Sequence, residues 1–229
     1  METAYDVLVV GGGTAGLRAA VEAARCGARA AVLARGGPCL GVVGFNAPVE
    51  ETGDSPARFF DETMVQGGFL CRPELAAALA YEARDQVRFL EGEGLSLRHG
   101  SGRYAPRLTS GNRIPRTLYT TDRTGPEIIG RLRRILGEAG VPVIQGANVR
   151  RVLVSPSDGR ACGALARDAE TGELSVYRAG AVILATGGLG PLYSVSTNSP
   201  ELTGDGYLLA WRPAPSSSIW SSCSSSPSP

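Results

Sequence analysis

The chain has 229 residues, of which 43% are hydrophobic and 20% are charged, so wholesale disorder is not expected. Its 23 basic and 22 acidic residues give a net charge of +1, which argues against a surface for nucleic acid or anionic lipid. The sequence contains neither a long uncharged apolar run nor a signal-peptide pattern, and we therefore expect no transmembrane segment and a cytoplasmic location.

The first part of the chain predicts a strand–helix–strand unit. The apolar run at 5–10 is typical of a buried strand, and a glycine-rich turn follows it at 11–16. The alanine-rich segment 17–26 has helical spacing and is expected to end at Gly27. A second buried strand is expected at 30–34, which completes a βαβ unit.

The middle of the chain predicts helices within a polar, irregular stretch. We expect helices at 56–66, 73–90 and 124–140. Each begins with a proline or a capping box, which are common signals at helix N-termini. The first two belong to a helical insertion at about 55–122.

The later part of the chain predicts strands. The expected elements are a strand at 141–144, an antiparallel meander at 149–154, 161–167 and 174–177, and a buried strand at 181–184. These elements predict an α/β fold: a Rossmann-like domain with a parallel sheet, the helical insertion and a small antiparallel β-meander.

Cysteine and histidine give no support for a metal site or a nucleophilic triad. The five cysteines are scattered, and none forms a C-x-x-C pair, so we expect isolated buried thiols. The single histidine, His99, lies in a loop-like segment and is expected to be exposed.

The glycine-rich turn has the spacing G-x-G-x-x-G between a strand and a helix, which is typical of dinucleotide binding. Gly11 permits the tight turn, Gly13 lets a pyrophosphate approach the backbone, and Gly16 allows the helix to pack on the strand. The N-terminus of the helix supplies free N–H groups and a partial positive charge.

The end of the second strand lacks the acidic residue that usually binds a ribose at this position. Ala34 and Arg35 stand there instead. Arg35 could receive an NADP phosphate or lie along an FAD phosphate or ribose, and this position alone leaves both readings open.

Several short motifs follow one another along the chain. They are the fingerprint at 5–16, R-T-L-Y at 116–119, D-R-T-G at 122–125, A-T-G-G at 185–188, T-N at 197–198 and T-G-D-G at 203–206. In these motifs, their order and their spacing, the chain resembles the succinate dehydrogenase and fumarate reductase flavoproteins, a family that includes L-aspartate oxidase.

This resemblance implies the FAD-binding portion of an oxidoreductase that transfers a hydride between a dicarboxylate-like acid and flavin N5. The residues it implies for FAD are Gly11, Gly13, Thr14, Ala15 and Gly16 at the pyrophosphate, Ala34, Arg35, Gly36 and Gly37 along the adenosine, Val149 at the adenine, Thr186 and Gly187 at a second crossing, and Asp205 near the flavin.

The resemblance also implies what to expect of attachment, catalysis and partners. Family members with covalent FAD carry a histidine after the second strand, and residues 35–52 contain none, so the FAD is expected to be non-covalent. The catalytic groups of the family lie in a capping domain and a later segment, so no catalytic residue is assigned here. The partners expected for the full-length protein are a small acid substrate and an electron-transfer partner.

Two alternatives remain at this point: a non-catalytic flavin-binding or interaction module, and an NADP-dependent reductase. The incomplete FAD-binding domain is expected at 1–212, followed by a disordered Ser/Pro tail at 213–229. One back-translation of this tail, read one nucleotide earlier, gives A-G-A-E-L-I-D-M-E-F-V-Q-F, which continues the family sequence. We therefore interpret the tail as a frameshift product.

Overall fold

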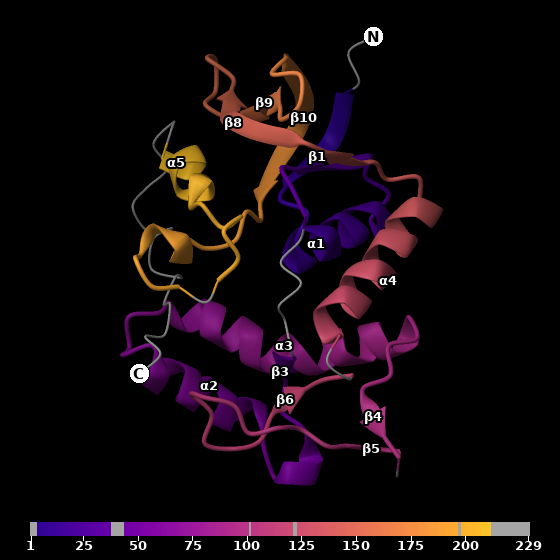
Figure 1. Cartoon of the computed structure of the whole chain (residues 1–229), viewed down its shortest axis with the longest axis vertical. Helices are drawn as coiled ribbons and strands as arrows, with labels where there is room; N and C mark the ends of the chain where they lie inside the picture. The colour runs from indigo at the N-terminus through magenta and orange to yellow at the C-terminus, as the bar shows by residue number, and fades with distance from the viewer. Residues whose placement is uncertain (1–3, 38–43, 101, 121–122, 197, 212–229) are drawn as a thin grey trace. The chain divides into compact units, whose positions relative to one another are not determined.

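The computed structural model describes residues 4–37, 44–100, 102–120, 123–196 and 198–211 (Figure 1). The chain divides into two compact units. Unit 1 contains the described residues of 1–39 and 129–215, and unit 2 those of 40–128. Unit 1 is therefore formed by two segments that are far apart in the sequence. The predicted tail at 213–229 lies outside the described residues, and its interpretation as a frameshift product stays a prediction.

Unit 1 is built on a six-stranded sheet in the order β7-β2-β1-β10-β9-β8. Its strands are β1 (Ala4–Val10), β2 (Ala30–Ala34), β7 (Val143–Gln145), β8 (Ala147–Val154), β9 (Ala161–Asp168) and β10 (Leu174–Leu184). The β7–β2, β2–β1 and β1–β10 pairs are parallel, whereas β10–β9 and β9–β8 are antiparallel. The predicted α/β fold with a parallel sheet and a meander is confirmed.

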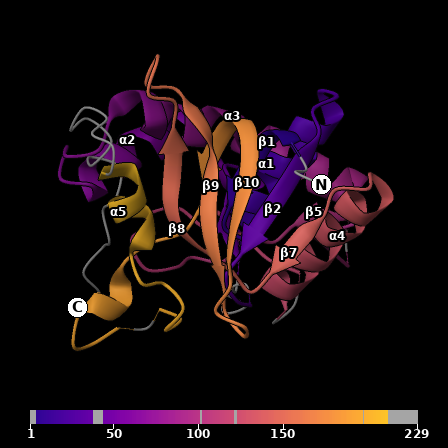
Figure 2. The same cartoon turned by 90° about the horizontal axis from the view of Figure 1, so that it is seen from above.

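Strand β10 belongs to both kinds of pairing. Its first residues, from Leu174 to Arg178, pair with β9, and Arg178 and later residues pair with β1. Figure 2 shows β8, β9 and β10 side by side. The two strands predicted at 174–177 and 181–184 are thus one continuous strand.

The core of unit 1 follows from the alternation of side chains along β1 and β2. Leu8 and Leu33 are fully or almost fully buried in a cluster with Ala164 of β9 and Leu209 of α5 (Asp205–Trp211). Their strand neighbours point to the opposite face of the sheet, where α1 (Thr14–Arg25) contacts β1 and β2. Burying each leucine contributes about 1.5–3 kcal/mol.

Unit 2 is built from helices and two short antiparallel ladders. Its elements are η1 (Glu50–Thr52), α2 (Pro56–Gln66), α3 (Pro73–Gly92), β3 (Phe45–Asn46) paired with β6 (Thr117–Leu118), and β4 (Arg98–His99) paired with β5 (Arg103–Tyr104). The division between the units falls within the sequence of helix α4 (Thr124–Glu138), after residue 128. The short helix η2 (Gly190–Leu192) belongs to unit 1. The Ser55 hydroxyl accepts a hydrogen bond from the Arg58 N–H at 3.2 Å and so caps the N-terminus of α2.

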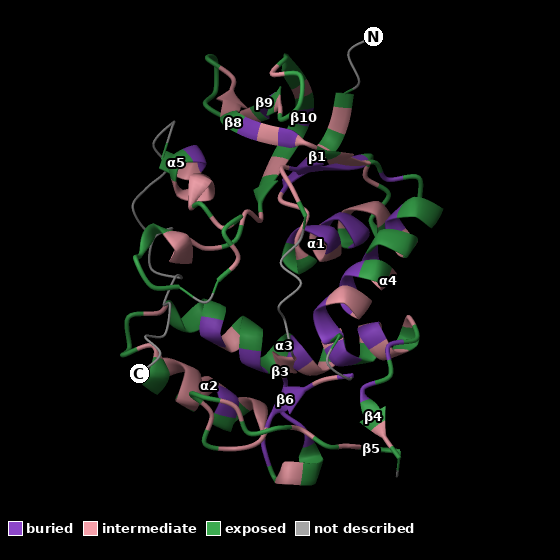
Figure 3. Ribbon diagram, viewed as in Figure 1, coloured by how far each residue is buried: buried purple, intermediate pink, exposed green. Residues whose placement is uncertain are grey.

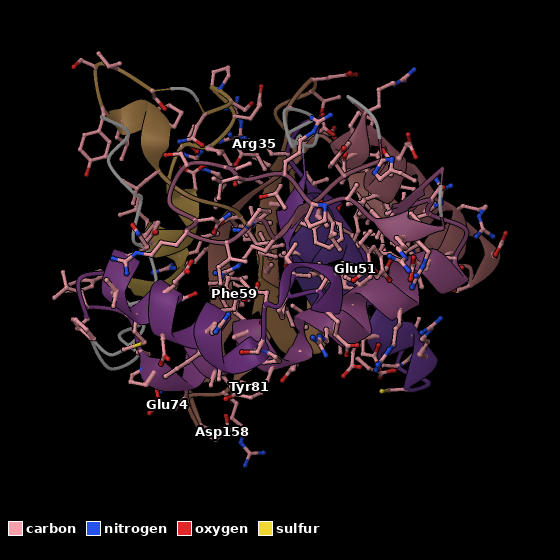
Figure 4. All side chains as sticks on the ribbon, turned by 90° about the horizontal axis from the view of Figure 1, so that it is seen from below. Arg35, Glu51, Phe59, Glu74, Tyr81 and Asp158 are labelled. Carbon is pink, nitrogen blue, oxygen red and sulfur yellow. The ribbon has the colours of Figure 1, made fainter. Side chains whose placement is uncertain are left out.

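A buried ion cluster surrounds Arg116 in unit 2. The Arg116 Nε and Nη2 atoms donate to the two carboxylate oxygens of Asp54, at 2.9 and 3.2 Å. Its Nη1 lies 2.9 Å from Glu62 Oε2 on α2, and its guanidinium lies 4.8 Å from the ring centre of Phe59, a residue labelled in Figure 4. Arg116 directly precedes β6, so its contacts with Glu62 and Phe59 connect this strand to α2. Figure 3 shows β6 as buried.

Two expectations about single residues are wrong. Cys26 and Cys162 are exposed rather than buried, because Cys26 caps the end of α1 and Cys162 lies on an outward position of β9. His99 is half-buried in β4 rather than exposed in a loop, and its ring centre lies 4.7 Å from that of Tyr119.

The described helices and side chains bear on membrane and metal binding. Across those residues, no helix combines the length and the apolar character that crossing a membrane requires. The same part of the chain holds no cluster of three or more His, Cys, Asp or Glu side chains suited to a metal ion.

Candidate cofactor site

The glycine turn between β1 and α1 is held by close backbone packing. Gly11 has a φ of 123°, and a Cβ at this position would overlap the carbonyl of Ala185. A Cβ at Gly16 would overlap the carbonyl of Gly11, and one at Gly12 would lie 2.7 Å from the Cβ of Ala34. The turn therefore packs against the ends of β2 and β10 in a way that only glycine permits.

Gly13 differs from its neighbours because it faces open space. A Cβ at Gly13 would meet no atom within 4 Å, and its backbone is extended, with φ −80° and ψ 179°. Gly13 is the N-cap of the 12-residue helix α1 and offers no side chain to the first N–H groups. Thr14 and Ala15 follow it and are exposed. Uncapped N–H groups at the positive end of a helix dipole suit an anionic group such as a pyrophosphate.

Arg35, labelled in Figure 4, is held by the segment that leads into α5. Its Nη1 donates to Thr203 Oγ1 and to Asp205 Oδ2, both at 2.7 Å. Its Nη2 donates to the backbone carbonyl of Glu201 and lies 3.5 Å from the carboxylate of the same residue. Two predicted site residues that are 170 positions apart, Arg35 and Asp205, are thus brought together. The guanidinium charge faces two carboxylates.

The other residues predicted along the adenosine lie around the end of β2. Ala34 is fully buried and packs toward Gly12, so its methyl group does not face an open site. A Cβ at Gly36 would lie 3.1 Å from Glu201 Oε2, whereas one at Gly37 would meet nothing within 4 Å.

The A-T-G-G segment at 185–188, where the resemblance implies that the chain passes the cofactor a second time, packs beside the glycine turn. The Ala185 N–H donates to the carbonyl of Val10 at 2.8 Å, which continues the β1–β10 ladder to the glycine turn. A Cβ at Gly206 in α5 would overlap Thr186 Oγ1, and Gly187 has a φ of 79°. The A-T-G-G and T-G-D-G motifs are therefore packed against each other.

A cavity of about 190 Å³ in unit 1 adjoins two further predicted residues. It is lined by Val149, Arg150, Arg151, Asp205, Leu208 and Leu209. Val149 and Asp205 were predicted from the resemblance, whereas the arginines and leucines were not. Helix α5 is absent from the elements expected from the sequence, so Leu208 and Leu209 had no assigned place.

A second cavity, of about 300 Å³, lies in unit 2 and contains none of the predicted site residues. Four of its charged groups form ion pairs: Arg84 pairs with Glu50 at 3.3 Å, and Arg98 with Glu91 at 3.0 Å. The Tyr104 hydroxyl donates to Glu91 at 2.7 Å, and partial burial, with this carboxylate, raises the pKa of Tyr104 to about 12. We therefore place the candidate site in unit 1.

Comparison with known proteins identifies the family of the chain. Residues 6–214 match the family model described as FAD binding domain. The chain is 35% identical over 216 residues to a CoM/CoB fumarate reductase subunit of Methanothermobacter marburgensis, covering 90% of this chain and 39% of that protein. It is 31% identical over 223 residues to L-aspartate oxidase of Yersinia pestis, covering 90% of this chain and 42% of that protein.

A solved structure shares the fold. In the Mycobacterium smegmatis Sdh1 complex in the apo form, one chain matches with a TM-score of 0.80 and 36% identity, covering 93% of this chain and 39% of that chain. The chain thus spans about two fifths of the length of the relatives it matches. Those relatives are oxidoreductases, and the predicted resemblance is confirmed. The glycine turn, its open helix end and these matches together show that the chain belongs to the FAD-binding domain family of the fumarate reductase, succinate dehydrogenase and L-aspartate oxidase flavoproteins, with FAD as its cofactor.

Proposed function

We propose that the chain is the FAD-binding part of an oxidoreductase that acts on a dicarboxylate-like acid. The observation that carries the proposal is the open space at Gly13, in front of the uncapped N-terminus of α1. When bound there, FAD supplies a hydride acceptor or donor at its N5 atom. The chain contributes binding and orientation of this cofactor.

The proposed binding roles follow the packing of unit 1. The pyrophosphate accepts hydrogen bonds from the backbone N–H groups of Gly13, Thr14 and Ala15. Gly11 and Gly16 keep the turn tight enough for the pyrophosphate to approach. Arg35 to Gly37 lie along the adenosine, with Val149 at the adenine. Thr186, Gly187 and Asp205 complete the site from the second crossing.

The substrate and partners of the longer protein are proposed from its relatives. Their names include fumarate and L-aspartate, which are four-carbon dicarboxylates, and one matched structure is of a complex. We accordingly propose a small dicarboxylate-like substrate, an electron-transfer partner and a cytoplasmic location for the full-length protein.

The alternative of an NADP-dependent reductase has less support. It required Arg35 to receive a phosphate, but this guanidinium already contacts Asp205 and lies 3.5 Å from the Glu201 carboxylate. A phosphate added beside this arginine would be repelled by both carboxylates. A measurement of turnover distinguishes the second alternative, a non-catalytic flavin-binding module, from an enzyme.

Turnover is the first expected outcome. The 229-residue chain loaded with FAD should oxidise reduced dye with fumarate or related acids at a rate at least about 1,000-fold below that of a full-length version. The reason is that the resemblance assigns the catalytic groups, which are an arginine that transfers a proton and the groups that bind the carboxylates, to a capping domain and a later segment. Equal rates for the two versions would contradict this division of labour, and no turnover by either would favour the non-catalytic module.

Release of the flavin is the second expected outcome. Acid precipitation of the FAD-loaded protein should leave all yellow colour in the supernatant, because residues 35–52 offer no histidine for a covalent link. The absorbance of pellet and supernatant measures this directly. Flavin that stays with the denatured pellet would show a covalent bond and contradict the proposal.

A further inference from the structure

Arg150 interrupts the regular alternation of β8 beside the 190 Å³ cavity. Val149 pairs with Ala166 and Arg151 pairs with Leu165, so Arg150 is an extra residue on its strand. In a regular strand, neighbouring side chains point to opposite faces, whereas a bulge re-aims them. Both Arg150 and Arg151 line the cavity, as expected of such a bulge.

The two arginines bring uncommitted guanidinium groups to this cavity. Both are exposed, and among the described residues neither side chain has a hydrogen bond or an ion pair. Arg35, which contacts Asp205, is by contrast fully engaged. A planar guanidinium stacks well on the face of a flat aromatic ring.

The remaining lining of the cavity fits a flat ring with an amino group at its edge. Val149 and Leu209 are each only 6% exposed and give an apolar floor, and Leu208 borders it at 64% exposure. Arg35 and Thr203 both donate to Oδ2 of Asp205. Within the part of the chain that the structure describes, its Oδ1 accepts no hydrogen bond, so this oxygen can accept one from an N–H group.

We propose that Arg150 and Arg151 form an arginine clamp that stacks on the adenine ring of the cofactor, while Asp205 Oδ1 accepts a hydrogen bond from its exocyclic amine. The inference rests on the proposed FAD site and changes it in one respect: Asp205, which the resemblance implies near the flavin, is placed at the adenine, because it lines the same cavity as Val149. It also adds two arginines that select the adenine half. An arginine pair also suits a phosphate. The carboxylate beside it and the apolar floor favour a neutral ring over an anion in this cavity.

The test is the double variant Arg150→Gln/Arg151→Gln in the whole chain. We expect its affinity for FAD to fall about tenfold, while its affinity for FMN, which lacks adenine, stays the same. The matched control is Arg160→Gln in the β8–β9 turn, whose side chain is 86% exposed and does not line the cavity. Quenching of flavin fluorescence measures both affinities, and circular dichroism checks the fold.

A second variant and smaller ligands separate stacking from phosphate binding. Arg150→Lys/Arg151→Lys keeps both charges but removes the planar groups, so the clamp predicts a loss close to that of the glutamine variant. Adenosine and AMP should both bind the parent better than inosine and IMP, which lack the amine. If the lysine variant keeps full FAD affinity, or if inorganic phosphate competes as well as AMP, the arginines bind phosphate and the clamp is refuted.

The outcomes also separate this inference from the proposed function. A parent chain that binds FAD and a double variant that binds it equally well would refute the clamp alone. A parent that binds neither FAD nor FMN would refute the proposed function and the clamp with it.

Discussion

Replacement of Gly13 by valine is expected to weaken FAD binding by at least about 100-fold. The valine side chain would fill the open space in front of the first N–H groups of α1, where the pyrophosphate is proposed to lie. Its φ of −80° and ψ of 179° suit a β-branched residue, so the backbone of the turn should not change. Titration of the apoprotein with FAD, followed by flavin fluorescence, measures the loss.

The matched control for this variant is Gly137→Val. Gly137 lies in α4, and a Cβ there would likewise meet no atom within 4 Å, but the residue is outside the glycine turn. Its variant should keep the FAD affinity of the parent without a loss of stability, because valine is a better helix former than glycine and its Cβ has room here. If the Gly13→Val variant binds FAD with the affinity of the parent, the glycine turn does not form part of the cofactor site.

Replacement of Arg116 by alanine should lower the free energy of unfolding of unit 2 by about 3–5 kcal/mol. The side chain of Asp54 is fully buried and that of Glu62 is 15% exposed, so the variant leaves two carboxylates without their cation. The loss should appear as faster hydrogen exchange of the amides of α2, because Glu62 and Phe59 lie on this helix.

Arg88→Ala is the control for the buried cluster. Arg88 pairs with Asp85 on the surface of α3, with side chains 74% and 66% exposed, and its loss should cost no more than about 0.5 kcal/mol. The combined variant Arg116→Met/Asp54→Leu should recover part of the stability, because the uncompensated buried carboxylate of Asp54 is gone. Similar exchange rates in the Arg116→Ala and Arg88→Ala variants would mean that the cluster does not stabilise unit 2.

Local patterns predicted most of the fold in unit 1. Apolar runs and the glycine turn identify β1, α1 and β2, because these signals depend on neighbouring residues only. The sequence predicts two strands in place of β10, because Arg178 and Gly180 interrupt the apolar pattern at 178–180. The continuity of β10 depends on its pairing with two different strands, β9 and β1. The short ladders of unit 2 were missed for the same reason: Thr117 and Leu118 form a strand only where Phe45 and Asn46 pair with them.

The site was predictable where a residue type is required by the backbone. Gly11, Gly16 and Gly187 stand at positions of close approach or positive φ, and such glycines form recognisable motifs. The pairing of Arg35 with Asp205 was not predictable, because it joins residues 170 positions apart through side chains. The bulge at Arg150 likewise depends on the register of β8 against β9, which the sequence of β8 alone does not contain.

The place of β1 in the sheet has a consequence for synthesis on the ribosome. β1 is completed within the first ten residues, yet it lies between β2 and β10, and β10 ends at Leu184. At about 5–20 residues per second, translation leaves this apolar strand without one neighbour for on the order of ten seconds or more. During that time its free edge is open to pairing with other nascent chains. We therefore expect the yield of folded protein to depend on translation speed and on chaperones that shield an amino-terminal strand.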